Sequence, residues 1–288
     1  MTADSLVEIN IEKLLNIDYG YASQRIASFI SSYIRDAGAK GAVIGLSGGV
    51  DSSVTAALLV KALGASNVIG VIMPYTTTPQ VDIDDAKRLA ESLGIQYYYV
   101  PINDIRNSLA KSIPIFSESE TVTNGNILPR IRMTILYYFA NRFNMMVAGT
   151  GDKSEILIGY FTKYGDGGSD LLPIGDLYKG QVRRLGIFLG IPEDIAMKPS
   201  SPRLWEGQTA EGELGVSYDD VDVILHALVD LRLSPEEAAE ATGKPISTVM
   251  RIWRRVINTE HKRRLPPIPR IGLRTVGIDW RMPLNKDG

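Results

Sequence analysis

Residues 42–53 read AVIGLSGGVDSS, in which an apolar run passes directly into a turn of serine and glycine. The run predicts a buried strand, and the stretch from Val54 to Leu63 predicts a helix that begins at the turn. Unpaired N–H groups and the dipole at a helix start attract anions. Gly48 and Gly49 let the backbone approach a phosphate closely, because neither has a Cβ atom. The segment therefore predicts a phosphate-binding site.

The polar side chains of this turn specify the site further. Ser47, Ser52 and Ser53 add hydroxyl donors, whereas the Asp51 carboxylate repels phosphates unless a metal ion lies between them. The predicted ligands are therefore a nucleotide and Mg²⁺. No lysine follows the second glycine at the Walker A spacing, and the pattern is not G-x-G-x-x-G. A serine- and glycine-rich turn that only caps a helix is the structural alternative.

Composition sets the broad class of the protein. The chain has 288 residues, of which 44% are hydrophobic and 22% charged, as in ordinary globular proteins. Its net charge of −2 provides no basic field for nucleic acid or an anionic membrane. The absence of cysteine excludes disulfides, thiolate zinc sites and a cysteine nucleophile in this chain. Residues 1–8 do not resemble a signal peptide and no apolar run could span a bilayer, so we expect a cytoplasmic protein.

Short β-rich runs alternate with helical stretches through the first half of the chain. Strands are predicted at 42–46, 68–73, 96–100 and 145–148, and helices at 23–37, 51–63, 81–93 and 127–143. This alternation predicts an α/β fold, an open doubly wound parallel sheet of about five strands with helices on both faces. Ligands bind such sheets at the carboxyl ends of the strands, where the Ser47 turn falls.

The second half predicts a glycine-rich loop and then a helical C-terminal part. Residues 149–176 hold seven glycines and four aspartates, which indicates a long loop or lid rather than core. Helices are predicted at 177–189, 218–231, 235–242 and 246–260, followed by an extended, proline-rich segment at 265–270. The helix at 235–242 begins at a capping box from Ser234 to Glu237. We find no internal repeat and expect residues 1–288 to form a single domain.

Four further segments gather polar side chains. Residues 149–155 follow a predicted strand, so Glu155 should share a sheet edge with Asp51 and contribute to a magnesium site, unless the segment is a solvated turn. Residues 163–170, followed by Lys179, suit the recognition of a ribose or an amide. They equally suit a plain surface loop without a ligand. Residues 198–213 suggest a mobile loop that faces phosphates, or a disordered linker. Residues 260–264 form a basic cluster that on its own most simply stabilises a helix C-terminus.

In this order, the segments resemble those of the ammonia-dependent NAD synthetases, which are N-type ATP pyrophosphatases. The family pattern includes S-G-G-x-D-S, G-N-x-x-x-R-x-R-M-x-x-L-Y from Gly125 to Tyr137, G-T…K-S-E, G-Y-x-T-x-Y-G-D and E-H-K-R, and the match covers nearly the whole chain. The resemblance implies an adenine nucleotide alpha hydrolase-like fold. It also implies that ATP adenylylates the carboxylate of nicotinic acid adenine dinucleotide (deamido-NAD) with release of pyrophosphate. Ammonia then displaces AMP to give NAD, the last step of NAD biosynthesis.

The resemblance also implies site residues, motif by motif. The expected ATP-binding residues are Gly45, Leu46, Ser47, Gly48, Gly49, Val50, Asp51, Ser52, Thr150, Lys179 and Ser201. The expected deamido-NAD-binding residues are Arg130, Tyr137, Lys163, Asp166, Glu213, His261 and Lys262. The expected ligands of Mg²⁺ are Asp51, Glu155 and Ser201. The expected catalytic residues are Asp51, Lys179 and Asp166, with Asp166 as the candidate base that accepts a proton from ammonium.

The chain departs from the family pattern in three places. Asp152 stands where the family often has Asn, Ala210 stands where it often has Asp, and residues 76–78 lack the arginine that often follows Met-Pro. Glutamine-using members carry an extra amidohydrolase domain with a cysteine nucleophile, which this chain lacks. The expected nitrogen source is therefore free ammonia, or ammonia made by another chain. The family is homodimeric, and the helix at 127–143 is a candidate interface, although such an apolar stripe also suits plain core.

Two other functions compete with this one. Residues 238–255 look like a helix-turn-helix whose basic second helix ends at Arg254 and Arg255, as in a DNA-binding regulator. The net charge of −2 and the lack of a linker before Ser234 argue against that function. The other alternative is an ATP pyrophosphatase that acts on a different carboxylate or carbonyl substrate. We therefore expect small-molecule substrates, and neither nucleic acid nor a membrane as a partner.

Overall fold

A parallel sheet forms the centre of the first half of the protein. The structure is a computed structural model that describes residues 8–205 and 207–280. In this part of the chain the sheet has four strands, β1 (Ala42–Gly45), β2 (Val68–Ile72), β3 (Gln96–Tyr99) and β4 (Met146–Ala148), in the order β3-β2-β1-β4. The chain steps outward from β1 to β3 and then returns to the other side of β1. In open α/β sheets such a reversal of strand order opens a crevice for ligands.

The predicted fold class, a doubly wound parallel sheet flanked by helices, is confirmed. All four predicted strands are present, with boundaries that differ by one residue. The sheet has four described strands, where about five were expected. Beyond β4 a single parallel bridge joins Ala148 to Leu171, at the place where a fifth strand would lie.

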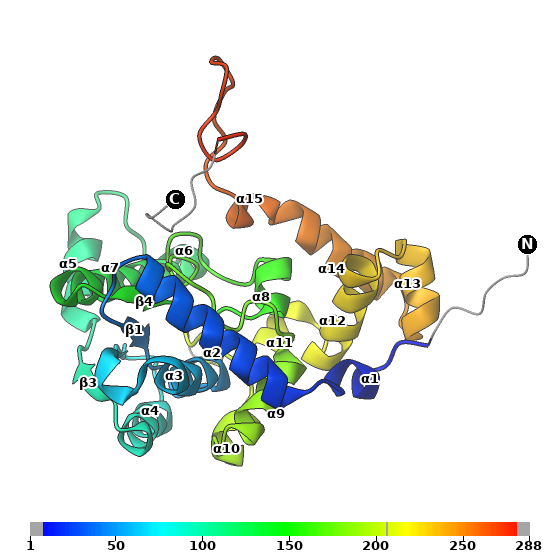
Figure 1. The fold of residues 1–288 in the computed structure, drawn as a ribbon. Coiled ribbons are helices and arrows are strands. Elements are labelled where there is room, and N and C mark those ends of the chain that lie inside the picture. The colour runs from blue at the N-terminus through cyan, green and yellow to red at the C-terminus, as the bar shows by residue number, and fades with distance from the viewer. Residues whose placement is uncertain (1–7, 206, 281–288) are drawn as a thin grey trace, which may run out of the picture.

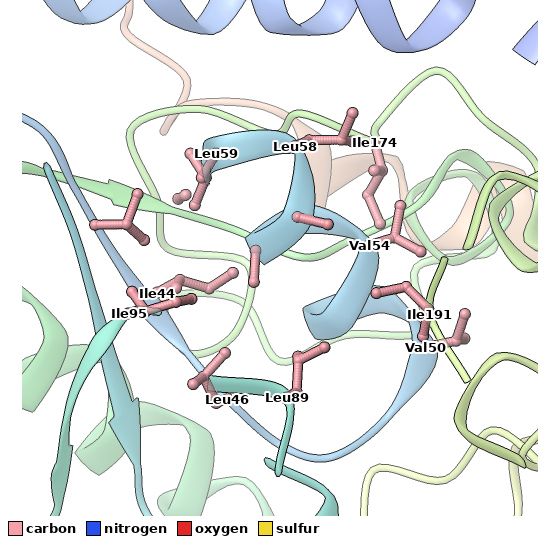
Figure 2. Close-up of a cluster of buried hydrophobic side chains, with 14 of the residues drawn as sticks. Ile44, Leu46, Val50, Val54, Leu58, Leu59, Leu89, Ile95, Ile174 and Ile191 are labelled. Atoms are coloured by element: carbon pink, nitrogen blue, oxygen red, sulfur yellow. The ribbon is translucent and has the colours of Figure 1, made fainter. Parts of the chain in front are cut away.

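Alternate side chains of β1 divide the core between the two faces of the sheet. Ile44 packs in one cluster with α2 (Tyr19–Asp36), α3 (Val50–Leu63) and α4 (Gln80–Leu93). Figure 2 shows this cluster, where Ile44 gathers with side chains of α3 and α4. Val43 packs on the opposite face with α7 (Ile127–Phe143). Because helices cover both faces, the central strands are apolar at successive positions rather than alternating.

The other helices that precede α12 are short. They are α1 (Ile11–Leu15), η1 (Ala65–Asn67), α5 (Asn103–Ser112), α6 (Thr121–Gly125), α8 (Lys153–Ile158), α9 (Lys179–Phe188), α10 (Glu193–Ala196) and α11 (Ala210–Leu214). Only α9 was predicted, because helices of one to three turns carry too few residues for a clear apolar period. None of the described helices combines the length and the hydropathy needed to cross a membrane.

The C-terminal part is a helical bundle with its own core. It contains α12 (Tyr218–Leu225), which continues as a π-helical turn (His226–Asp230), then α13 (Pro235–Thr242), α14 (Ile246–Asn258) and α15 (Glu260–Arg263). Apolar side chains of α12, α13 and α14 form one cluster with Ile158 of α8 and Leu14 of α1. The predicted capping box at Ser234 is present. Figure 1 shows the bundle beside the sheet, with α8 and α11 between them.

The prediction that residues 149–176 form a loop or lid rather than core is wrong in part. The segment contains α8, and Leu171 and Ile174 are buried in the cluster that includes Ile44. Seven glycines dominate its composition and hide the few apolar residues that anchor it. The segment therefore packs against the sheet beside β4 as part of the core.

After α15 the chain leaves the body of the molecule. Residues 265–280 form an extended arm that points away from the helices (Figure 1). The proline-rich segment predicted to be extended lies at the base of this arm. Large apolar side chains of the arm are exposed, among them Ile271 and Leu273.

Gly48 provides a test of how tightly the turn after β1 packs against α4. Its φ is 75°, and a Cβ atom there would lie 2.1 Å from the carbonyl oxygen of Asp82. We expect Gly48→Ala to lower the free energy of unfolding by clearly more than the ~1–2 kcal/mol of the left-handed conformation alone. Gly243→Ala is the control, because Gly243 has a φ of 65° and nothing lies within 4 Å of the added Cβ. Urea unfolding of both variants gives the comparison, and equal losses would contradict the prediction.

Candidate active site

A cavity of about 490 Å³ opens at the carboxyl ends of β1, β2 and β4. Its wall includes residues of the turn at 45–52, the ends of β2 and β4, one face of α7, the loop at 198–205, and Lys262 of α15. The cavity therefore lies at the edge of the sheet where the strand order reverses. This is the edge at which parallel sheets bind their ligands.

The turn after β1 has the form of an anion cradle. Gly49 is the N-cap of α3 and no side chain caps it, so N–H groups of the first helical turn are open to a ligand. The hydroxyl oxygens of Ser47 and Ser52 lie 3.0 Å apart, and both residues line the cavity. Ser53 is buried and its hydroxyl donates to the Gly49 carbonyl at 2.8 Å. Ser52 also donates to this carbonyl, at 3.0 Å, but Ser53, unlike Ser52, is not part of the cavity wall, so Ser53 braces the turn and its expected role as a donor to the ligand finds no support.

A buried ammonium group lies behind this turn. Lys179 Nζ, at the start of α9, is 2.7 Å from Asp51 Oδ2, 2.9 Å from Asp152 Oδ2 and 2.9 Å from Glu155 Oε1. The Lys179 side chain has no exposed surface. Asp51 follows β1, whereas Asp152 and Glu155 follow β4. The Lys179 ammonium group therefore links the segments after these two strands, on either side of the crevice. The structure thus brings together Asp51, Glu155 and Lys179, as expected, and adds Asp152, for which no role was predicted.

The charges of this cluster do not balance. Burial alone would lower the pKa of Lys179, but the carboxylates of Asp152, Asp51 and Glu155 raise it well above its ordinary value. Burial, aided by the like charges nearby, raises the pKa of both Glu155 and Asp152. Asp51 Oδ1 is buried and has no hydrogen-bond partner. The cluster can therefore accommodate a further cation.

These features fit a bound Mg²⁺. Asp51 and Glu155 both line the cavity, and carboxylate oxygens are the ligands that Mg²⁺ prefers. Within the described ranges, no three His, Cys, Asp or Glu side chains form a metal-binding group by themselves, so hydroxyls, water or phosphate oxygens must complete the shell. The Ser201 hydroxyl, an expected ligand, donates to the Gln208 carbonyl at 2.6 Å. The neighbouring Ser200 hydroxyl, in the same loop expected to face phosphates, is buried without a partner and also lines the cavity, so it is a second candidate ligand from this loop.

Ion pairs hold the loop at 198–205 against the anion cradle. Lys198 Nζ donates to the Gly48 carbonyl at 2.9 Å, to Asp82 Oδ1 at 2.9 Å and to Asp85 Oδ2 at 2.5 Å. Arg203 Nε donates to Asp82 Oδ2 at 3.0 Å. Sequence reasoning assigned none of these four charged residues a role. The available signal was the spacing of Asp82 and Asp85, one turn apart in the helix predicted at 81–93; the structure buries both of them on α4.

Three of the residues expected to bind deamido-NAD lie together at another part of the cavity wall. Asp166 Oδ1 accepts a hydrogen bond from the backbone N–H of Thr162 at 2.8 Å, and the crowding of protein atoms around it raises its pKa. Lys262 Nζ donates to the carbonyls of residues 159 and 161, each at 2.7 Å. Glu213 Oε1 accepts from the Tyr160 hydroxyl and from Gln208 Nε2, each at 2.7 Å.

The other four lie outside the cavity of this chain. Arg130 Nη2 donates to the Lys163 carbonyl at 3.3 Å, and Lys163 Nζ donates to the His261 carbonyl at 2.6 Å, which gives an exposed cluster. The Tyr137 hydroxyl donates to Asp170 Oδ1 at 3.0 Å, and Asp170 in turn accepts from the backbone of β4 at 2.7 Å. Tyr137 therefore braces the sheet edge. The binding roles of these four residues stay predictions.

The cavity also presents residues for which no role was predicted. Arg132 Nε donates to the Met73 carbonyl at 3.1 Å, and burial lowers the pKa of Arg132 to about 10. Arg255 of α14 lines the cavity as well. Arg132 belongs to the R-x-R-M motif, and Arg255 to the segment that resembles a helix-turn-helix, so both were visible in the sequence. Two positions that depart from the family pattern, Thr78 and Ala210, are also part of the wall.

An anion cradle, a lysine held among carboxylates and a second loop rich in hydroxyls define a nucleotide-dependent enzyme of the doubly wound α/β class. The family model for NAD synthase matches residues 22–266. The NH(3)-dependent NAD(+) synthetase of Hyperthermus butylicus is 52% identical over 265 residues, which cover 91% of this chain and 95% of that protein. The chain therefore belongs to the NAD synthase family.

Solved structures support the same assignment. The NMN synthetase of Francisella tularensis is 35% identical with a TM-score of 0.78, over 89% of this chain and 100% of that chain. The NH3-dependent NAD synthetase of Campylobacter jejuni is 29% identical with a TM-score of 0.75, over 88% of this chain and 100% of that chain. The predicted family, the ligase class and the ATP-dependent amidation that ends NAD biosynthesis are thereby confirmed.

Asp222 of α12 makes the stability of this site depend on pH. It accepts hydrogen bonds from Ser154 Oγ at 2.5 Å and from Gly180 N at 2.8 Å, directly beside the Lys179 cluster. Burial raises its pKa from 3.8 to about 7. The folded state therefore holds the proton more tightly than the unfolded state. This group stabilises folding at low pH, and the contribution is lost as the pH rises through about 7.

We expect Asp222→Asn to remove this contribution, because asparagine keeps the shape but does not titrate. Between about pH 5 and pH 7, the wild-type free energy of unfolding should fall more steeply with pH than that of the variant, by up to roughly 1.4 kcal/mol per pH unit. Asp219→Asn is the matched control, since Asp219 lies exposed on the same helix. Urea unfolding across this range measures the slopes, and parallel curves for wild type and Asp222→Asn would refute the assignment.

Proposed function

We propose that the chain makes NAD from deamido-NAD, ATP and free ammonia. The nicotinate carboxylate attacks the α-phosphorus of ATP, and pyrophosphate leaves. The nitrogen of ammonia then attacks the activated carbonyl carbon, and AMP leaves with the former carboxylate oxygen. The observation that carries the proposal is one continuous cavity whose wall includes both the anion cradle at 47–52 and Asp166 with Lys262. A nucleotide and a second anionic substrate can therefore meet in it.

The ATP phosphates are proposed to bind at the anion cradle, with residues 45–52 and Thr150 around them. Open N–H groups at the start of α3 supply donors that need no rearrangement during the reaction. Lys179 is proposed to stabilise the charge that develops on the departing pyrophosphate. Its contact with Asp51 at 2.7 Å supports this role, because it fixes the ammonium group directly behind the cradle.

Mg²⁺ is proposed to be held by Asp51 and Glu155, with the hydroxyl of Ser201 or Ser200. When bound, the ion neutralises negative charge on the phosphates and on the leaving pyrophosphate. Two observations support the proposal: Asp51 Oδ1 lacks a partner, and the cluster around Lys179 carries more carboxylates than cations.

Asp166 is proposed to accept the proton that ammonium must lose before its nitrogen can attack. A base of this kind works best with a pKa near the operating pH. The raised pKa of Asp166 supports the role, and the bond from the Thr162 backbone fixes the carboxylate in the cavity wall. Lys262 and Glu213, in the same wall, are proposed to bind deamido-NAD.

The enzyme is proposed to act as a cytoplasmic homodimer of single-domain chains, with α7 at the interface. Tyr138 of α7 is 69% exposed, and the Arg130–Lys163–His261 cluster lies outside the cavity of this chain. A second copy seated on this side would enclose that cluster and bring it into a substrate site.

The activity test measures products with ATP, Mg²⁺ and deamido-NAD, with and without ammonium. We expect NAD that depends on ammonium, with AMP and pyrophosphate in equal amounts. Nicotinate mononucleotide is the competing substrate to include, because the Francisella tularensis relative is an NMN synthetase. A higher kcat/KM for nicotinate mononucleotide than for deamido-NAD would make the mononucleotide the proposed substrate. Absence of product with both acids would overturn it.

Removal of a metal ligand should raise the Mg²⁺ requirement. We expect Asp51→Asn to increase the Mg²⁺ concentration for half-maximal activity by roughly tenfold or more, because an amide oxygen is a weaker ligand than a carboxylate. Asp84→Asn is the control, since Asp84 is exposed on α4 and only accepts a bond from Gln80. Chelation of the metal should abolish wild-type activity. An unchanged Mg²⁺ requirement in Asp51→Asn would exclude Asp51 as a ligand.

A further inference from the structure

Packing turns one arginine of the basic helix α14 into the cavity. Val249, Ile252 and Val256 are buried in the core of the C-terminal bundle. Because their positions fix the rotation of α14, Arg255 lines the cavity while Arg254 is exposed. Arg255 was not among the residues expected to bind a substrate.

Arg255 lacks any partner for its charge. Across residues 8–205 and 207–280 its guanidinium makes no ion pair, and its Nε atom is buried without a hydrogen-bond acceptor. A buried donor without an acceptor costs free energy, and arginine cannot relieve that cost by losing its proton. A ligand that brings an oxyanion to the cavity would supply the missing acceptor.

The surroundings of Arg255 are cationic as well. Lys262 lies close enough that the Arg255 charge, together with burial, lowers the pKa of Lys262, while Asp166 acts in the opposite direction. Two acidic side chains also belong to this wall: Asp166, which accepts from the Thr162 backbone, and Glu213, which accepts from Tyr160 and Gln208. Arg255 and Lys262 therefore form a positive patch that no described carboxylate neutralises by direct contact.

We propose that Arg255 binds the diphosphate of the dinucleotide substrate and is a specificity-determining residue of this enzyme. The planar guanidinium donates to two phosphate oxygens at once, which the Lys262 ammonium group cannot do. ATP is the other source of phosphate in the cavity, but in the proposed function its phosphates bind at the anion cradle, with Lys179 buried behind it. The inference rests on that proposed function, since it assigns the far end of the same cavity to deamido-NAD.

The test compares Arg255→Gln, which removes the charge, with Arg255→Lys, which keeps it. We expect Arg255→Gln to raise KM and the dissociation constant for deamido-NAD by about tenfold to a hundredfold, with KM for ATP and kcat little changed. Arg255→Lys should recover part of the affinity. Arg254→Gln is the matched control, because it removes an equal charge from the exposed side of the same helix. Thermal unfolding of each variant shows whether the fold is retained.

Each outcome decides the point. Unchanged affinity for deamido-NAD in Arg255→Gln overturns the proposal, as does an equal loss in Arg254→Gln. A rise in KM for ATP alone assigns the arginine to the ATP phosphates instead. If Arg255→Gln does not fold, full wild-type affinity in Arg255→Lys overturns the bidentate contact. Failure of the proposed function can be told apart from failure of the Arg255 proposal. The first appears as absence of NAD formation by the wild-type enzyme, the second only in the affinities of the variants.

Discussion

The active-site geometry depends on the buried contact between Lys179 and three carboxylates. Asp51 comes from the turn after β1, Asp152 and Glu155 come from the segment after β4, and Lys179 begins α9. The contact therefore spans the place where the strand order reverses. Removal of Lys179 from such a buried cluster would cost about 3–5 kcal/mol, because the buried carboxylates would lose their countercharge. The Lys179 contacts therefore tie the two sides of the crevice together.

The same cluster gives the physical reason for the proposed metal ion at this phosphate site. The start of α3 attracts phosphate through its open N–H groups, whereas the carboxylates behind it repel phosphate. Lys179 is a single cation among three carboxyl groups, and the pKa of two of them, Asp152 and Glu155, is raised. A divalent cation between Asp51 and the phosphates removes the conflict, since it is attracted by both. The buried Asp51 Oδ1 atom, which has no hydrogen-bond partner, is a candidate ligand for such an ion.

The sequence predicted those parts of the fold and site that depend on neighbouring residues. The strand at 42–46, its turn and the helix after it are one local pattern, and the structure contains all three. Contacts between distant segments were not predictable in the same way. Lys198 binds Asp82 and Asp85 of α4, more than a hundred residues away, and no local pattern links them. Leu171 and Ile174 were assigned to a loop because the glycines around them obscure a burial that only tertiary packing decides.

The basic helix α14 shows why the sequence pattern alone left two functions open. Arg254 and Arg255 are adjacent, so a pattern of charges along a helix treats both as one basic surface, as in a DNA-binding helix. Their surroundings differ because Ile252 and Val256 enter the bundle core and set the rotation of the helix. One arginine is then exposed, and the other shares a wall with Lys262. The C-terminal bundle thus adds a positive charge to a cavity whose other walls come from the sheet edge. The packing of the bundle core determines that this charge is Arg255 rather than Arg254.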